Sequence, residues 1–263
     1  SSRSTDRLYQ SWTRVNSLTD YSDVPFSLGL PHCFWYHPPS FQGGMQQTFL
    51  QRGIGGRLRV FFAGWGMDEN PFADFRSSDS DILLCHDYRS LDFPSSLLEL
   101  YDEVRVVAWS LGVWAAAALM AEVPRLAEDA VAFNGTPFPV DEARGIPPAI
   151  FQGTLQGLST AALARFDRRM CGDASSLAQY NLVHPRRGVD SLAEELAWIG
   201  RESAVRAVAP RFRRAVVGCR DAIFLRMNQR NAWEGLCPVD EVEAAHYDLE
   251  TLRELVCGEA RHG

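Results

Sequence analysis

The chain has no lysine, because all 26 of its Lys and Arg residues are arginine. This absence excludes Schiff-base chemistry and any mechanism that uses lysine as a general base, since both need a primary amine side chain. Long apolar runs are also absent, and none approaches the ~18 consecutive apolar residues of a membrane span. The first residues lack the charged-then-apolar pattern of a signal peptide, so we expect a cytoplasmic protein.

Cysteines at metal-binding or redox spacing are missing as well. The six cysteines are widely separated and form no C-x-x-C pair, which indicates neither a zinc site nor a redox motif. We expect them to be free, buried thiols. The net charge of −7 argues against nucleic acid as a partner.

The 263 residues, 46% hydrophobic and 22% charged, are enough for one substantial globular domain. Residues 1–44 show no sustained period of 2 or 3.6, and prolines interrupt their aromatic cluster, Cys33 to Pro39. We interpret them as a poorly ordered extension, with an aromatic docking peptide as the alternative. The domain proper is then predicted over residues 45–263.

From Met45 onward, short apolar runs alternate with segments of helical length, which is typical of an α/β fold with a mostly parallel sheet. Strands are predicted at 48–52, 58–62, 81–86, 104–109, 130–134, 213–218 and 241–245, the first two as a hairpin. Residues 137–210 lack strand patterns and predict a helical cap over the site. Within it, Ser159 is an expected helix N-cap, and Ser191 with Glu194 an expected capping box.

The run Val106 to Trp109 ends at Ser110, and an alanine-rich segment follows Gly112. This order fits the G-x-S-x-G nucleophile elbow, with Ala108 in the first glycine position. An ordinary strand-to-helix turn is the alternative. A second apolar run ends in Gly64-Trp65-Gly66, the kind of loop that supplies an oxyanion donor, and the pair favours catalysis.

A serine nucleophile needs a histidine base and a carboxylate that orients it, here in the order serine, acid, histidine. His246 follows a predicted strand near the end of the chain and is the candidate base. Asp221 also follows a predicted strand and is the favoured acid. Asp141, just past the strand before the cap, remains an alternative.

These motifs carry a family resemblance. Together with further blocks in the same order from about Met45 onward, they resemble the BioG type of pimeloyl-[acyl-carrier protein] methyl ester esterase, an α/β-hydrolase. The blocks are Phe61-Phe-Ala-Gly-Trp-Gly-Met, His86-Asp-Tyr-Arg-Ser-Leu-Asp-Phe, Ala108-Trp-Ser-Leu-Gly-Val-Trp, Asn134-Gly-Thr-Pro, Gly145-Ile-Pro, Phe151-Gln-Gly-Thr-Leu, Phe166-Asp-Arg-Arg-Met-Cys-Gly and Glu243-Ala-Ala-His-Tyr.

The resemblance implies removal of the methyl group from pimeloyl-carrier-protein methyl ester in biotin biosynthesis. It implies Ser110 as nucleophile, His246 as base and Asp221 as acid, with the backbone N–H groups of Trp65 and Leu111 forming the oxyanion hole. This chemistry needs no metal or organic cofactor. The partner is an acyl carrier protein; the oligomeric state is left open.

Two other functions share these residues. The first is another acyl hydrolase, a carrier-protein thioesterase or a small-ester carboxylesterase, because the same triad cleaves all these substrates. The second is a hydrolase-fold protein that binds an acyl carrier without catalysis. The serine and histidine argue against the second.

A cluster of arginines falls in the predicted cap. Six arginines stand against Asp167 and Asp173 in residues 144–187, a balance of 6 − 2 = +4 in a chain of net charge −7. Carrier proteins are usually acidic, so these arginines predict a docking surface, with solvated ion pairs as the alternative. The six are Arg144, Arg165, Arg168, Arg169, Arg186 and Arg187. Arg168 and Arg169 are about 100° apart on a helix and cannot face the same way.

Overall fold

The computed structural model describes residues 44–258. These residues form a sheet in the order β1-β3-β2-β4-β5-β6-β7, in which β1 is antiparallel to β3 and every other neighbouring pair is parallel. The prediction of a mostly parallel α/β sheet is confirmed. The strands are β1 (Gln46–Gln51), β2 (Arg57–Phe62), β3 (Asp81–His86), β4 (Glu103–Trp109), β5 (Ala130–Phe133), β6 (Arg214–Gly218) and β7 (Val239–Val242).

The hairpin predicted for the first two strands is wrong. β1 pairs with β3, and β2 lies between β3 and β4. Residues 58–62 of β2 are all buried and have strand partners on both sides, whereas every residue of β1 is half-buried, as suits the edge of a sheet. The intervening loop passes the start of β3, where the Ile54 N–H donates to the Asp81 carboxylate at 2.8 Å.

The helix that follows β4 is buried along its whole length. All eight residues of α1 (Gly112–Leu119) are buried, and four of them are alanines. A helix that is apolar on every side belongs in a core, and the small alanines let it approach the sheet closely. Ser110 is therefore held at the junction of two buried elements.

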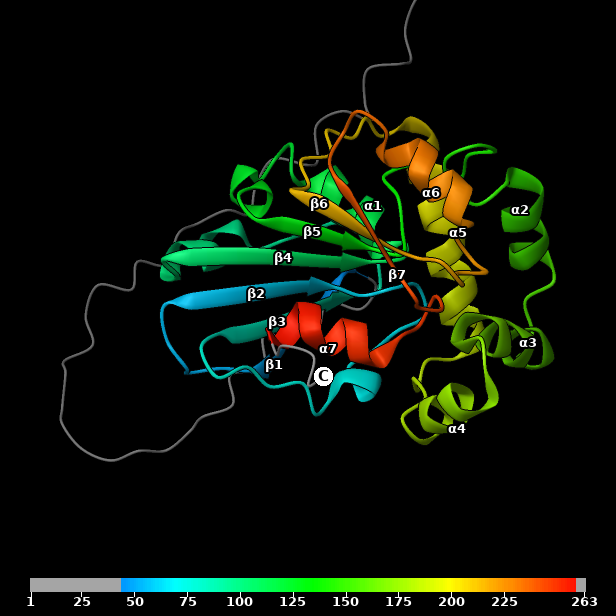
Figure 1. The fold of residues 1–263 in the computed structure, drawn as a ribbon, viewed down its shortest axis with the longest axis horizontal. Helices are drawn as coiled ribbons and strands as arrows, with labels where there is room; N and C mark the ends of the chain where they lie inside the picture. The colour runs from blue at the N-terminus through cyan, green and yellow to red at the C-terminus, as the bar shows by residue number, and fades with distance from the viewer. Residues whose placement is uncertain (1–43, 259–263) are drawn as a thin grey trace, which may run out of the picture. The chain divides into compact units, whose positions relative to one another are not determined.

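Four helices lie between β5 and β6, within the residues for which a cap is predicted. Figure 1 shows them beyond the end of the sheet to which the arrowheads of β2 and β4 point. We call residues 148–205 the helical insertion. Its helices are α2 (Pro148–Gln156), α3 (Thr160–Cys171), α4 (Ala174–Leu182) and α5 (Val189–Val205).

The two predicted helix starts have different outcomes. The Ser159 hydroxyl accepts the Ala162 N–H at 3.2 Å, so its assignment as the N-cap of α3 is confirmed. The capping box is wrong, because α5 begins at Val189 after Gly188 and Ser191 already lies inside the helix. The Ser191 hydroxyl instead accepts a hydrogen bond from Arg187 at 2.9 Å.

The last part of the described chain runs through β6, α6, β7 and α7. β7 ends at Val242, earlier than predicted, so His246 lies on the loop between β7 and α7. The remaining helices are α6 (Arg226–Trp233), α7 (Leu249–Cys257), and the 3-10 helices η1 (Asn70–Phe72), η2 (Ser95–Leu100) and η3 (Pro124–Ala127). The short helix η1 follows the loop after β2.

Other predictions fall partly outside the described residues. The structure does not describe residues 1–43, which include all of the predicted extension except Gly44. Cys33 is among these residues. Of the five described cysteines, all are free thiols; Cys85, Cys171 and Cys257 are buried, and Cys219 and Cys237 are half-buried. Among residues 44–258, no helix has the length and apolar character needed to cross a membrane.

Candidate active site

The nucleophile elbow is formed where β4 meets α1. Ser110 has a φ of 60°, a left-handed conformation that few non-glycine residues adopt, and its N–H donates to the Phe133 carbonyl of β5 at 3.1 Å. A Cβ at Gly112 would collide with the backbone carbonyl oxygens of Phe62 and Ala63. The glycine thus allows α1 to begin directly against the end of β2.

His246 links Ser110 to a carboxylate. Its Nε2 lies 2.9 Å from Ser110 Oγ, and its Nδ1 lies 2.9 Å from Asp221 Oδ2. The histidine and aspartate side chains are 1% and 0% exposed, so water does not compete for these hydrogen bonds. The structure brings the three residues together as the sequence predicts.

Two buried side chains hold the loop that carries His246. The Trp109 indole N–H donates to the His246 carbonyl at 2.9 Å, and the Asn134 amide donates to the carbonyls of Ala245 and His246 at 2.7 and 3.2 Å. Asn134 also accepts the Gly218 N–H at 2.7 Å, at the end of β6. The ends of β4 and β5 therefore set the position of the imidazole.

Each carboxylate oxygen of Asp221 accepts two hydrogen bonds. Oδ1 accepts the N–H groups of Ile223 and Phe224 at 2.8 and 3.0 Å, while Oδ2 accepts Gln229 Nε2 at 3.0 Å in addition to His246. Gln229 is fully buried on α6, and nothing in the local sequence marks it as part of the site.

The alternative acid is engaged elsewhere. The Asp141 carboxylate accepts hydrogen bonds from the N–H groups of Ala143 and Arg144 and from the Arg144 guanidinium, which lowers the pKa of Asp141. Of the two acids left open by the sequence, the structure therefore places Asp221 at the histidine.

The expected oxyanion donors border the same space. Trp65 and Leu111 both line a pocket with Ser110 and His246. Among the described residues, neither backbone N–H donates to a protein acceptor. Free N–H groups beside a nucleophile are what a developing oxyanion requires.

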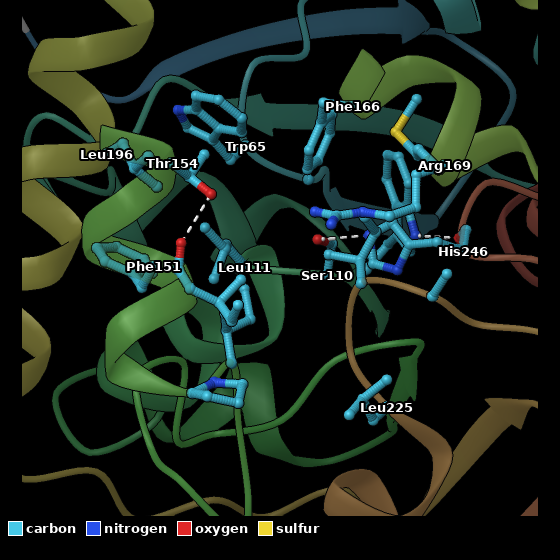
Figure 2. Close-up of a pocket in the computed structure, with 18 residues that line it drawn as sticks. Trp65, Ser110, Leu111, Phe151, Thr154, Phe166, Arg169, Leu196, Leu225 and His246 are labelled. Atoms are coloured by element: carbon cyan, nitrogen blue, oxygen red, sulfur yellow. Dashed lines mark hydrogen bonds between the residues drawn. The ribbon is translucent and has the colours of Figure 1, made fainter. Parts of the chain in front are cut away.

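The pocket is a largely apolar cavity of about 220 Å³. The sheet contributes Ser110 and its neighbours, and the helical insertion contributes Phe151 from α2, Phe166 from α3 and Leu196 from α5. Figure 2 shows Ser110 and His246 side by side, with these apolar side chains arranged around the space beside them. The arrangement suits an acyl chain whose reactive carbonyl lies at the serine.

The comparisons decide the family. A family model for pimeloyl-ACP methyl esterase BioG matches residues 45–255. The chain belongs to this family. A solved structure of BioG from Haemophilus influenzae is 35% identical, with a TM-score of 0.71, and the match covers 78% of this chain and 95% of that one.

Two further matches are more limited, one in the share of the relative that is covered and one in sequence identity. A protein of Bacteroides fragilis named malonyl-[acyl-carrier protein] O-methyltransferase is 46% identical over 197 residues, 74% of this chain but only 40% of that relative. An alpha/beta hydrolase enzyme from a deep-sea metagenome library of the Medee basin is 14% identical, with a TM-score of 0.52, over 81% of this chain and 93% of that one, which supports the fold alone. The predicted family and fold class are confirmed.

The arginines of this BioG chain are not equivalent. Arg187 is only 9% exposed, and its guanidinium forms ion pairs with Asp87 and Glu195 inside the protein. Arg144 pairs with Asp141 and stacks on Phe138. Local sequence could not show the partners of Arg187, because Asp87 follows β3 and Glu195 lies inside α5.

Five of the six arginines are exposed, and four of these five side chains pair with no other described residue: Arg165, Arg168, Arg169 and Arg186. Arg168 and Arg169 are about 100° apart on α3, and of the two only Arg169 lines the pocket. Of the four unpaired arginines, Arg169 therefore lies at the pocket, and Arg165 and Arg168 belong to the same helix, α3.

Acidic, cysteine and histidine side chains do not gather into a further site. Within residues 44–258, no three of them lie in an arrangement that could hold a metal ion.

Proposed function

We propose that this chain hydrolyses the methyl ester of a pimeloyl group carried on acyl carrier protein, a step in biotin biosynthesis. The observation that carries the proposal is the hydrogen-bonded series Ser110–His246–Asp221 beside an apolar pocket, in a chain of the BioG family. Because the chain spans 40% of the Bacteroides relative, methyl transfer is not carried over to it.

In this mechanism, Ser110 Oγ attacks the ester carbonyl carbon while His246 Nε2 takes its proton. The carbonyl oxygen becomes an oxyanion held by the N–H groups of Trp65 and Leu111, each donor contributing about 3–4 kcal/mol to transition-state stabilisation. The imidazolium then protonates the departing methanol, leaving an acyl-enzyme. A water molecule, deprotonated by His246, hydrolyses the acyl-enzyme and regenerates the serine.

Asp221 has two tasks in this scheme. It holds the imidazole with Nδ1 protonated, so that Nε2 is free to accept the serine proton, and it stabilises the imidazolium that forms. Hydrogen bonds from Ile223, Phe224 and Gln229 support the ionised carboxylate and keep its orientation.

Recognition of the substrate divides between two regions. The apolar side chains of the pocket suit the methylene chain of the acyl group. The carrier protein itself is too large for a cavity of about 220 Å³ and would remain outside the entrance. We propose that the exposed arginines Arg165, Arg168, Arg169 and Arg186 attract its acidic surface, chiefly by raising the association rate; Arg144 takes part only through its exposed portion.

One substrate can test the proposal and its main alternative. Pimeloyl-carrier-protein methyl ester contains both an ester and a thioester, and mass spectrometry of the carrier distinguishes the two cleavages. An esterase leaves the acyl chain on the carrier without its methyl group, whereas a thioesterase leaves a free thiol. We expect the first product with the native protein and neither with Ser110→Ala. A free-thiol product would contradict the proposal.

A binding protein without catalysis is distinguished by labelling. A fluorophosphonate reacts only with an activated serine, so an adduct at Ser110 supports catalysis. Its absence, together with carrier binding, would favour the binding function. Turnover of short esters without activity on the carrier-bound ester would favour a small-ester carboxylesterase. Restored growth of a biotin auxotroph that lacks its methyl ester esterase tests the role in the cell.

A further inference from the structure

The loop that carries the Trp65 N–H is attached to the helical insertion. Gly64-Trp65-Gly66 follows β2, and Gly66 has a φ of 81°. The Trp65 indole N–H donates to the Leu192 carbonyl of α5 at 2.9 Å. This is the first of two connections by which α5 holds the loop.

The second connection is a carboxylate with no contact with solvent. Glu195 lies on α5 and is 0% exposed. Its Oε1 accepts the Tyr88 N–H at 2.9 Å, and its Oε2 accepts the Gly66 N–H at 3.3 Å. One side chain of the insertion thus joins the loop after β2 to the loop after β3.

Arg187 supplies the charge that Glu195 needs. Its guanidinium donates to Glu195 Oε2 at 2.6 Å, to the Met67 carbonyl at 3.5 Å and pairs with Asp87 at 3.1 Å. Burial raises the pKa of Glu195, and the adjacent guanidinium opposes that rise. An isolated carboxylate at this depth would be costly, whereas a paired one is stable.

The contact between Glu195 and Gly66 lies next to the Trp65 peptide, so it bears on the local geometry of this loop as well as on the stability of the fold. Gly66 N–H belongs to the peptide that directly follows Trp65, so the direction of the Trp65 N–H depends on the same short turn. Oxyanion-hole donors act at about 3 Å from the developing oxyanion, so a small displacement of a donor weakens the stabilisation steeply. The contact of Glu195 with the Gly66 N–H therefore lies one peptide away from the expected oxyanion donor.

We propose that Glu195 is a positioning residue for the oxyanion hole, acting through Gly66 and the Trp65 peptide, with Arg187 as its charge partner. The inference rests on the proposed ester hydrolysis at Ser110. It gives the helical insertion a part in the chemical step in addition to its part in lining the pocket.

The neighbouring glutamate provides a matched control. Glu194 is 64% exposed and pairs with Arg89 at the surface. Glu195→Gln keeps the shape of the side chain but removes its charge and places an amide NH₂ against a backbone N–H. Glu194→Gln makes the same chemical change without touching the loop.

We would measure kcat and KM for a p-nitrophenyl ester, and the affinity for a trifluoromethyl ketone that forms a hemiketal oxyanion at Ser110. Active sites are counted by fluorophosphonate labelling, so that loss of folded protein is not read as loss of activity. For Glu195→Gln we expect kcat to fall about tenfold or more, less than the loss of a whole oxyanion donor. KM should stay near its native value and ketone affinity should fall in parallel; Glu194→Gln should match the native protein.

Trp65→Phe tests the same idea without altering a buried charge, because it removes the indole hydrogen bond to Leu192. It also shortens a side chain that lines the pocket, so KM for the ester is measured beside kcat to report any change in substrate binding. It should also lower kcat and ketone affinity together, and it decides the matter if Glu195→Gln does not fold. Unchanged kcat and ketone affinity in the folded variants would overturn the inference, whatever their melting temperatures. A native protein inactive toward esters would instead overturn the proposed function, and the positioning role with it.

Discussion

Three consecutive strands of this protein end in a non-glycine residue with positive φ. Asp87 follows β3, Ser110 follows β4 and Asn134 follows β5, with φ values of 59°, 60° and 44°. Among the described residues, no other non-glycine position has a positive φ. Ser110 is the proposed nucleophile, Asn134 holds the loop that carries His246, and Asp87 pairs with Arg187. The strained backbone is therefore concentrated around the proposed site.

Single substitutions in the proposed triad should remove most of the activity. We expect Ser110→Ala and His246→Ala each to lower kcat by about 10⁴–10⁶-fold, and the double variant to lose little more, because the residues act as one unit. Asp221→Asn should cost about 10³–10⁴-fold by favouring the wrong tautomer, while Asp141→Asn should remain near native. Ester hydrolysis by the purified variants is the measurement. A larger loss for Asp141→Asn than for Asp221→Asn would contradict the assignment.

Gln229 should matter through the orientation of Asp221. Its amide donates to Asp221 Oδ2 and to the Phe224 carbonyl, while its own Oε1 is buried without a partner. Gln229→Met should therefore lower kcat by about tenfold or less, since one hydrogen bond to a charged group is lost. Asn231→Ala, a solvent-exposed amide on the same helix, is the control. A native kcat for Gln229→Met would show that the backbone donors suffice.

At the scale of elements, the site depends on close approaches between backbones. The start of α1 lies against the end of β2, and the loop after β5 lies against Ser110. Such approaches need glycine because any Cβ would overlap a carbonyl oxygen, which cannot move away as a flexible side chain can. The elbow and the oxyanion loop are consequently one packed unit.

Two glycine-to-alanine changes should have opposite effects on stability. At Gly112 the new methyl group would strike the carbonyls of Phe62 and Ala63, so we expect a loss of about 1–3 kcal/mol and lower kcat. At Gly153, in α2, a Cβ meets nothing within 4 Å, so alanine should stabilise the helix by up to about 1 kcal/mol. Denaturant unfolding measures both. A stable, fully active Gly112→Ala variant would contradict the packing argument.

At the scale of the whole molecule, charge is unevenly distributed. The chain carries a net −7, yet four exposed arginines lie on or beside the helices that border the pocket. A net negative protein repels an acidic partner at long range, so local positive charge near the entrance would direct the encounter. The burial of Arg187 shows that sequence charge counts overstate the charge available for this purpose.

Reversing the charge of an exposed arginine tests whether these arginines attract the carrier protein. Arg168→Glu should lower kcat/KM severalfold for the carrier-bound ester and leave a p-nitrophenyl ester unaffected, with the difference shrinking as salt is raised. Arg211→Glu, an exposed arginine before β6 and away from the pocket lining, is the control. Equal losses on both substrates would indicate damage to the pocket instead of weaker docking.

The sequence alone determined the features that depend on neighbours along the chain. The elbow at Ser110, the glycine-bounded loop at Trp65 and the placement of Asp221 and His246 after strands are all local patterns, and the structure brings these residues together as expected. The parallel sheet was predictable for the same reason, since alternating apolar runs and helical segments are properties of short stretches.

Only the tertiary structure decided which distant residues meet. It separated Asp221 from Asp141, placed β1 beside β3 instead of β2, and buried Arg187 against Glu195. In each case several partners were compatible with the local pattern, and the choice was made by packing and by the need to satisfy buried polar groups. Those requirements act between segments far apart in sequence, so no single stretch of the chain contains them.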